Sequence, residues 1–284
     1  MKYFTLPLVA QASSLWRQAR CLSHRRGIGL GGIFLMKGFI YALQLLTIIP
    51  VKIKNTVEER KLGRSTAFFP LVGAVQGLLL VGANLLFSRF LPTDIASGLV
   101  LVVLILTNGG FHLDGFADTI DGLAGGNTKE ERLEIMRDSR IGAIGVVALI
   151  LLLLTKFLAI NSLQAEIKNY ILFLIPVIGR WSMVPMAYWA DYARPTSGLG
   201  RAFTENTGIK EFLPATFLAL FFSTIFLGWL ALPYLAIMLF MVYLITVFFR
   251  KKLGGVTGDV FGFQSEMSEV LFILIVIAGG NIKI

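Results

Sequence analysis

The sequence contains very little cysteine or histidine. Cys21 is the only cysteine among 284 residues, and His24 and His112 are the only histidines. A single thiol excludes a disulfide within one chain, and so few soft ligands exclude a Cys/His zinc site. A serine triad could draw its base only from His112. If this protein is an enzyme, carboxylates and a hard cation must carry its chemistry.

Charged residues are also scarce, at 15% of the chain against 56% hydrophobic residues. Such a chain cannot cover a soluble globule with polar surface, so we expect a membrane protein. Windows of about 20 residues, enough to cross about 30 Å of hydrocarbon, predict an all-α, polytopic transmembrane helical bundle. A shorter apolar segment at 36–51 is expected to form an interfacial or half-inserted N-terminal helix. Seven spans are expected, near residues 65–88, 95–113, 141–160, 169–190, 213–230, 231–249 and 267–283.

The first 35 residues fit poorly with the rest, because a short apolar run is followed by a basic tract. They could be a signal peptide, since "LVAQA" resembles a cleavage site, or a flexible basic arm on the membrane surface. We favour a third interpretation, in which the functional chain effectively begins at Met36. Residues 1–35 are then an extension outside the fold, and 36–284 form a single integral-membrane catalytic domain.

Successive connections between the predicted spans are alternately rich and poor in lysine and arginine. The connections that are poor in them contain only Arg89, Lys168 and Lys283. Because basic residues near span ends are retained in the cytoplasm, the basic loops are predicted to be cytoplasmic. Topology and anionic lipid account for the net charge of +9, and no interleaved basic and aromatic surface indicates a nucleic-acid partner. The basic loops are those at 52–64, 114–140, 191–212 and 250–266.

The stretch "GGFHLDGFADTIDGLAGG" at 109–126 places three aspartates after an apolar run. If the helix that crosses from 95 continues through 122, Asp114, Asp118 and Asp121 lie within about 60° of one another. A divalent cation would remove their repulsion, and oxygen ligands suit magnesium. The alternative is a solvated helix end neutralised by arginines. Four glycines should let a phosphate-bearing ligand approach the backbone: Gly115, Gly122, Gly125 and Gly126.

The following stretch, "NTKEERLEIMRDSRIGAIG", predicts a short cytoplasmic helix. Thr128 and Glu131 have the spacing of a capping box at its start. Glu134, Arg137 and Asp138 follow on a neighbouring stripe. Glu134 and Arg137 could simply pair at i,i+3.

Acids and arginines beside an acidic helix face also suit magnesium and a diphosphate. Arg140 lies just beyond the stripe. His112, at the edge of the aspartates, could cap or hydrogen-bond rather than act as a base.

Two cations fall inside predicted spans. Arg180 lies midway along a span that prolines and glycine interrupt, and such a charge needs a partner. That partner could be the aspartates or a substrate phosphate, or the side chain could extend toward the cytoplasm. Lys156 is near the outer end of its span, where we expect its amine to reach the interface.

Four stretches carry a resemblance: "GGFHLDGFADTIDGLAGG", "RLEIMRDSRIGAIG", "FFPLVGAVQG" and "GGVTGDVFGFQSEMSE". They resemble the cobalamin synthase family, the adenosylcobinamide-GDP ribazoletransferases, from about Met36 to the last span. The resemblance implies a magnesium-dependent enzyme of the bacterial inner membrane, whose active site faces the cytoplasm. In the implied reaction, α-ribazole or its 5′-phosphate displaces GMP from adenosylcobinamide-GDP. The resemblance also makes Asp259, otherwise an ordinary acidic residue of a loop, a candidate for substrate binding.

We therefore expect an in-line phosphoryl transfer that depends on positioning and charge neutralisation. The expected catalytic residues are Asp118, Asp121 and Asp138, with Asp138 as the candidate general base. The expected magnesium ligands are Asp114, Asp118, Asp121 and Glu134. The expected substrate-binding residues are His112, Arg137, Arg140, Arg180 and Asp259.

Other classes of protein remain open. "DTIDG" at 118–122 is similar to the start of the CDP-alcohol phosphotransferase signature, although the rest of that signature is displaced here. A secondary transporter would also have broken helices and intramembrane charges, but no internal repeat is convincing. A scaffold subunit would leave the aspartates unexplained. Nothing in the sequence supports a homo-oligomer.

Overall fold

The protein is seen in a computed structural model that describes residues 31–49, 58–195 and 198–279. Within these ranges the chain is helical and has no strand, apart from one isolated parallel bridge between Tyr192 and Val256, so the all-α prediction is confirmed. The helices are α2 (Gly31–Leu46), α3 (Glu59–Arg64), η1 (Ser65–Phe68), α4 (Phe69–Phe87), α5 (Thr93–Asn108), α6 (Phe111–Gly125), α7 (Lys129–Ile135), α8 (Ala143–Asn161), α9 (Ala165–Trp189), α10 (Leu199–Asn206), α11 (Ile209–Leu227), η2 (Gly228–Leu230), α12 (Ala231–Leu253) and α13 (Gly258–Ala278).

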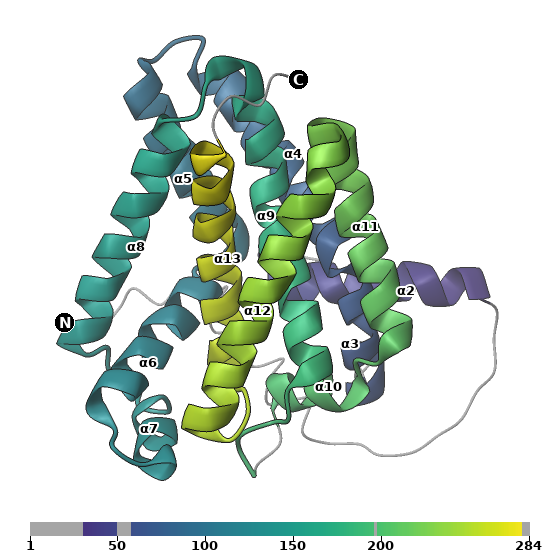
Figure 1. Cartoon of the computed structure of the whole chain (residues 1–284), viewed down its shortest axis with the longest axis vertical. Coiled ribbons are helices and arrows are strands. Elements are labelled where there is room, and N and C mark those ends of the chain that lie inside the picture. The colour runs from purple at the N-terminus through teal and green to yellow at the C-terminus, as the bar shows by residue number, and fades with distance from the viewer. Residues whose placement is uncertain (1–30, 50–57, 196–197, 280–284) are drawn as a thin grey trace.

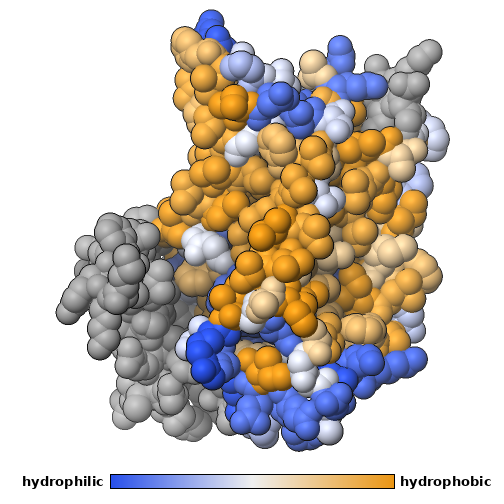
Figure 2. Space-filling model, turned by 90° about the vertical axis from the view of Figure 1, so that its left-hand side faces the viewer, coloured by the Kyte–Doolittle hydropathy of each residue, from blue (hydrophilic) through white to orange (hydrophobic). Residues whose placement is uncertain are grey.

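Within the described residues, five helical stretches are long and apolar enough to cross a membrane, or six if the bent pair α5 and α6 forms one span. One of the five, Ile209–Leu253, contains two of the seven expected spans, because a turn at Gly228 separates α11 from α12. These two helices lie side by side in Figure 1. Figure 2 shows an apolar belt between two polar ends, as a multi-pass membrane protein requires.

Helix α9 is the centre of the bundle, since 94% of its most apolar window is buried, against 28% for α8. α4 packs closely on it through two glycines. A Cβ atom at Gly77 or Gly73 would collide with the carbonyl oxygens of Phe173 and Pro176 in α9. Small residues that let backbones approach are the usual means of packing helices in lipid, where burying apolar surface provides no force.

Two expected boundaries are wrong. The helix from 95 does not continue through 122: α5 and α6 meet at an angle of 87°, across Gly109 and Gly110, whose φ angles are +64° and +76°. Glycine adopts this left-handed conformation without steric cost. The last helix begins at Gly258 rather than near 267, because polar residues such as Ser265 and Glu266 are buried inside the protein.

The N-terminal helix α2 begins at Gly31, so residues 31–35 of the expected extension are helical. Residues 1–30 lie outside the described part of the chain. In Figure 1, α3, α7, α10 and the turn between α12 and α13 gather at the lower end, whereas α13 ends at the upper end. The described parts of the predicted basic loops are therefore together at one end of the molecule.

Candidate active site

The site is built where α6 crosses α13 at very short range. A Cβ at Gly115 of α6 would lie 2.8 Å from the carbonyl oxygen of Asp259, and one at Gly262 of α13 would lie 3.0 Å from that of His112. Neither position has room for a side chain. This backbone contact brings the aspartates of α6 against Asp259, which is 24% exposed and lies at the start of α13.

Asp118 is at the centre of this group. The charges that act on it are those of Asp114, Asp259 and Asp121, all repulsive, and of Arg194. The three α6 aspartates do share one helix and one side of it, as the sequence predicted, even though that helix is shorter than expected. The structure adds Asp259, which sequence reasoning had placed among substrate-binding residues only.

Asp121 is already engaged in holding two helices together. Its carboxylate accepts hydrogen bonds from the backbone N–H groups of Gly142 and Gly145, both at 2.7 Å, at the start of α8. A side chain at either glycine would collide with that carboxylate. Asp121 therefore acts as the N-terminal cap of a neighbouring helix, where a negative charge is stabilising.

Asp259 is held by Arg194, a residue that sequence reasoning missed. The Arg194 guanidinium donates to Asp259 Oδ2 at 2.7 Å and to the Met136 carbonyl at 3.4 Å. The Thr257 hydroxyl donates to the same carboxylate oxygen at 3.2 Å. Arg194 and Asp259 are 65 residues apart, so no local pattern could have indicated the pair.

Three of the four glycines expected to clear space for a ligand, Gly115, Gly122 and Gly126, are instead packed against other parts of the protein. Gly115 packs on α13, and a Cβ at Gly122 would come within 2.5 Å of Met136. A Cβ at Gly126 would lie 2.6 Å from the backbone nitrogen of Arg132. These glycines let α7 and α13 pack closely around α6, which fixes the positions of the aspartates.

Helix α7 begins with the predicted capping box. The Thr128 hydroxyl accepts from the Glu131 N–H at 3.2 Å, and Glu131 accepts from the Thr128 N–H at 3.3 Å. Hydrogen bonds from the Asn127 and Thr128 N–H groups lower the pKa of Glu131. Glu134 is exposed and is not among the charges that act on Asp118.

Asp138 and Arg140 pair with each other. The Arg140 guanidinium donates to Asp138 Oδ2 at 2.6 Å, and the Arg140 side chain is 87% exposed. The hydrogen bonds from Arg140 lower the pKa of Asp138, which weakens it as a proton acceptor.

Arg180 lies in a separate network of buried charges. It donates to Asn108, Ser265 and Glu269, and Lys156 donates to Glu266 at 2.5 Å and Glu269 at 2.7 Å. Arg180 is fully buried and is not among the charges acting on Asp118. The expectation that Lys156 reaches the interface is wrong, because its side chain is 1% exposed and neutralised by two glutamates.

His112 is under the influence of the same network. It is buried, and its Nδ1 has no hydrogen-bond partner among the described residues. The charges that act on it are those of Arg180 and Lys156 and not those of the aspartates.

Comparison with known proteins gives the family. The family model described as cobalamin-5-phosphate synthase matches residues 38–277. The adenosylcobinamide-GDP ribazoletransferase of Geotalea daltonii is 37% identical over 247 residues, covering 87% of this chain and 99% of that protein. The chain belongs to the cobalamin-5-phosphate synthase family.

Other relatives of the same name agree. The protein of Pseudomonas syringae pv. syringae is 37% identical and covers 84% of this chain and 98% of its own length. That of Thermodesulfovibrio yellowstonii is 34% identical and covers 85% and 96%. No solved structure matches this chain. The match of the cobalamin-5-phosphate synthase family begins inside α2, so every residue of the candidate site lies within it.

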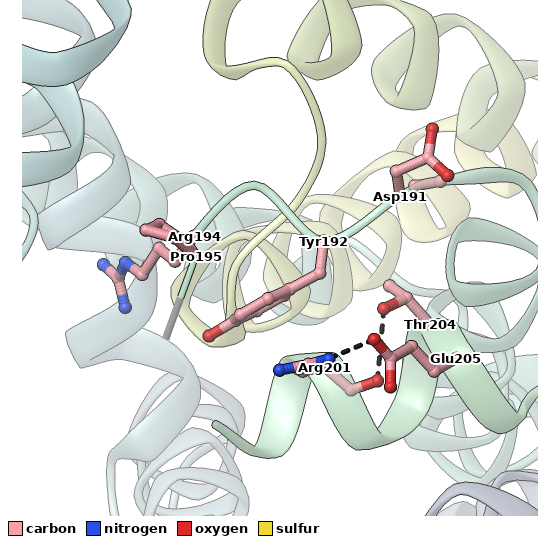
Figure 3. Close-up of a pocket in the computed structure, with 8 residues that line it drawn as sticks. Asp191, Tyr192, Arg194, Pro195, Arg201, Thr204 and Glu205 are labelled. Atoms are coloured by element: carbon pink, nitrogen blue, oxygen red, sulfur yellow. Dashed lines mark hydrogen bonds and ion pairs between the residues drawn. The ribbon is translucent and has the colours of Figure 1, made fainter. Parts of the chain in front are cut away.

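In this cobalamin-5-phosphate synthase family member, a pocket of about 440 Å³ lies between the segment 190–195 and α10. Arg194, which holds Asp259, is one of the residues that line it. Figure 3 shows the Tyr192 ring lying over α10, with its hydroxyl on the side where the Arg194 and Arg201 side chains end. Burial raises the pKa of Tyr192, although the positive charges of Arg194 and Arg137 oppose the rise. Three arginines, Arg137, Arg194 and Arg201, therefore interact electrostatically with Tyr192, as does Asp259.

The residues suit magnesium in kind. Within the described ranges, no three Asp, Glu, His or Cys side chains form a ready-made metal site. Magnesium does not require one, because it usually keeps several waters and binds through one or two carboxylates together with substrate phosphates. Asp118, with Asp114 and Asp259 acting on it, offers such a partial set of hard oxygen ligands.

Proposed function

We propose that this protein catalyses the reaction for which its relatives are named, the transfer of ribazole to adenosylcobinamide-GDP. The observation that carries the proposal is the excess of carboxylates around Asp118. These carboxylates lie within the region that matches 99% of the length of the Geotalea daltonii enzyme. The product is adenosylcobalamin, or its 5′-phosphate when the nucleophile is α-ribazole 5′-phosphate.

In the proposed reaction, the ribazole 3′-hydroxyl attacks the phosphorus that carries the cobinamide. A new phosphorus–oxygen bond forms, the diphosphate bond breaks, and GMP leaves. The hydroxyl proton passes to a carboxylate of the α6 face, since Arg140 makes Asp138 a weak acceptor. Asp121 and Gly115 hold that face against α8 and α13.

Asp118 and Asp114 would hold magnesium when the diphosphate binds, with Asp259 nearby. Bound magnesium neutralises charge on the diphosphate and on the leaving phosphate. Arg194 supports this arrangement, because it holds Asp259 in place and supplies positive charge next to the aspartates. Glu134 is left without a part in this proposal, since its side chain is directed to solvent.

We further propose that the site faces the cytoplasm from a bacterial inner membrane. The apolar belt in Figure 2 supports insertion in a bilayer, and the basic residues near α3, α7, α10 and α12 support the orientation. Guanine nucleotides and magnesium are available on that side. Both substrates would then enter from the polar end of the bundle, where the aspartates lie.

GMP release by purified protein in detergent tests the proposal. Wild type supplied with adenosylcobinamide-GDP, α-ribazole and Mg²⁺ should release GMP, and Asp118→Asn should release it at least about 100-fold more slowly. Asp94→Asn is a matched control, because Asp94 begins α5 at the far end of the bent pair and accepts a hydrogen bond from Asn161. Absence of GMP from wild type, or undiminished release from Asp118→Asn, would contradict the proposal. Turnover of a CDP-activated lipid precursor alone would support the CDP-alcohol phosphotransferase alternative instead.

A further inference from the structure

The pocket beside Asp259 has the size of a nucleotide site. Its volume of about 440 Å³ lies in the range of small-molecule pockets, and it is too small for a corrinoid ring system. Asp191, Tyr192, Arg194, Arg201, Thr204 and Glu205 line it. An aromatic ring and two guanidinium groups are the residue types that bind a heteroaromatic base and a phosphate.

Tyr192 is fixed in position by the backbone on both sides of it. The Val256 N–H donates to the Asp191 carbonyl and the Ala193 N–H donates to the Val256 carbonyl, both at 2.9 Å. On the α10 side, a Cβ at Gly198 would lie 2.6 Å from the Tyr192 hydroxyl, and one at Gly200 would lie 2.9 Å from its ring. The ring is therefore a rigid wall of the pocket rather than a mobile surface side chain.

The two arginines of the pocket differ in how firmly their carboxylate partners hold them. Arg194 is 15% exposed and held by Asp259 in the candidate site. Arg201 is 42% exposed and pairs with Glu205 at 2.7 Å, one helical turn away. An exposed i,i+4 pair contributes little stability, so Arg201 can move to a ligand phosphate at small cost. Thr204, whose hydroxyl donates to the Arg201 carbonyl at 3.2 Å, lies on the same side of α10.

We propose that this pocket binds a nucleoside 5′-phosphate, with the phosphate on Arg201 and the base against the Tyr192 ring. The inference rests on the proposed function, which supplies two ligands of this chemistry: α-ribazole 5′-phosphate and the leaving GMP. Arg194 links the pocket to the aspartates, since this residue lines the pocket and its guanidinium holds Asp259.

The test compares two nucleophiles that differ by one phosphate. For Arg201→Gln, we expect the KM for α-ribazole 5′-phosphate to rise about tenfold or more, because a charge-assisted hydrogen bond is lost. The KM for α-ribazole, which has no phosphate to lose, should rise much less than the KM for its 5′-phosphate. An unfolding temperature in detergent equal to that of wild type shows that the variant is folded. Arg201→Lys should recover part of the loss.

The source of the ligand follows from which constant changes. A raised KM for α-ribazole 5′-phosphate assigns the pocket to the nucleophile. A raised KM for adenosylcobinamide-GDP, together with weaker inhibition by GMP, assigns it to the leaving nucleotide, and either result supports a nucleoside 5′-phosphate site. Unchanged constants, or an equal loss of kcat with every substrate, would overturn the inference.

Two further variants sharpen the test. Tyr192→Ala should weaken binding of the same ligand that Arg201→Gln affects, about tenfold, through lost stacking, whereas Tyr192→Phe should retain it. Lys210→Gln is the control, since it removes a cation from the neighbouring pocket on the same end of the molecule and should change neither KM.

Calorimetric binding of GMP and of α-ribazole 5′-phosphate separates this inference from the proposed function. If wild type released no GMP but bound either ligand, and Arg201→Gln bound it at least about tenfold more weakly, the pocket would stand and the proposed reaction would fall. If wild type released GMP, and Arg201→Gln bound both ligands as tightly as wild type does, the proposed reaction would stand and the inference about the pocket would fall.

Discussion

The molecule contains two groups of charges that differ in how they are balanced. In the interior, two cations, Lys156 and Arg180, meet two carboxylates, Glu266 and Glu269, and all four side chains are buried. At the polar end, Asp118 experiences three other carboxylates and one arginine, and the site is partly open. A balanced group can hold helices together, whereas an unbalanced and accessible one can take up a cation and a ligand.

The interior group ties distant helices to one residue. Glu269 of α13 accepts from Lys156 of α8 and from Arg180 of α9, and Arg180 also donates to Asn108 at the end of α5. Asn108 in turn accepts from Gln76 of α4 at 2.5 Å. The network thus fixes the residue that precedes the bend before α6, and so supports the active-site helix from the interior of the bundle.

The largest expected effect is on stability, from Glu269→Ala. The change leaves two cations without this partner in a buried site, and breaking a buried ion pair typically costs about 3 to 5 kcal/mol. We expect a large fall in the unfolding temperature in detergent, or loss of folded protein. Glu166→Ala is the control, because Glu166 is exposed at the start of α9. Equal unfolding temperatures for the two variants would show that the interior network does not hold the bundle.

Asp118→Asn should reduce activity without reducing stability, in contrast to Glu269→Ala. We expect GMP release to fall by about 100-fold or more, since charge stabilisation at a transferring phosphoryl group is lost. The unfolding temperature should be equal to that of wild type or higher, because a repulsive charge is removed. A loss of stability comparable to that of Glu269→Ala would show that the two groups do not differ as described.

A smaller effect is expected where Asp121 caps α8. Gly145→Ala should displace the Asp121 carboxylate and cost about 1 to 3 kcal/mol, as should Asp121→Ala. The double variant should cost no more than the larger single change, because both remove the same hydrogen bonds. Additive losses in thermal unfolding would indicate that Asp121 and Gly145 act independently.

The smallest effect is expected for Asp138→Asn. Its carboxylate is exposed and paired with Arg140, and its lowered pKa disfavours proton uptake. GMP release should stay within about twofold of wild type, since substitutions at the surface away from such a site have little effect. A hundredfold loss of kcat with unchanged KM would restore Asp138 as the general base.

Local patterns in the sequence predicted the parts of the site that depend on one helix. The spacing of Asp114, Asp118 and Asp121 gave their common side of α6, and the Thr128–Glu131 capping box is confirmed. Pairings across helices could not be predicted, because Lys156 meets Glu266 from 110 residues away and Arg194 meets Asp259 from 65. Hydropathy averages also placed the start of α13 too late, since they count Glu266 as a solvated residue and cannot register a buried partner.

We propose that the carboxylates around Asp118 bind magnesium together with the substrate diphosphate. The most direct measurement is the dependence of GMP release on Mg²⁺ concentration, after removal of metal with EDTA, for wild type, Asp118→Asn and Asp94→Asn. We predict no release without Mg²⁺ and a half-saturating concentration at least about tenfold higher for Asp118→Asn, with Asp94→Asn unchanged. Identical Mg²⁺ dependence in Asp118→Asn and wild type would contradict the claim.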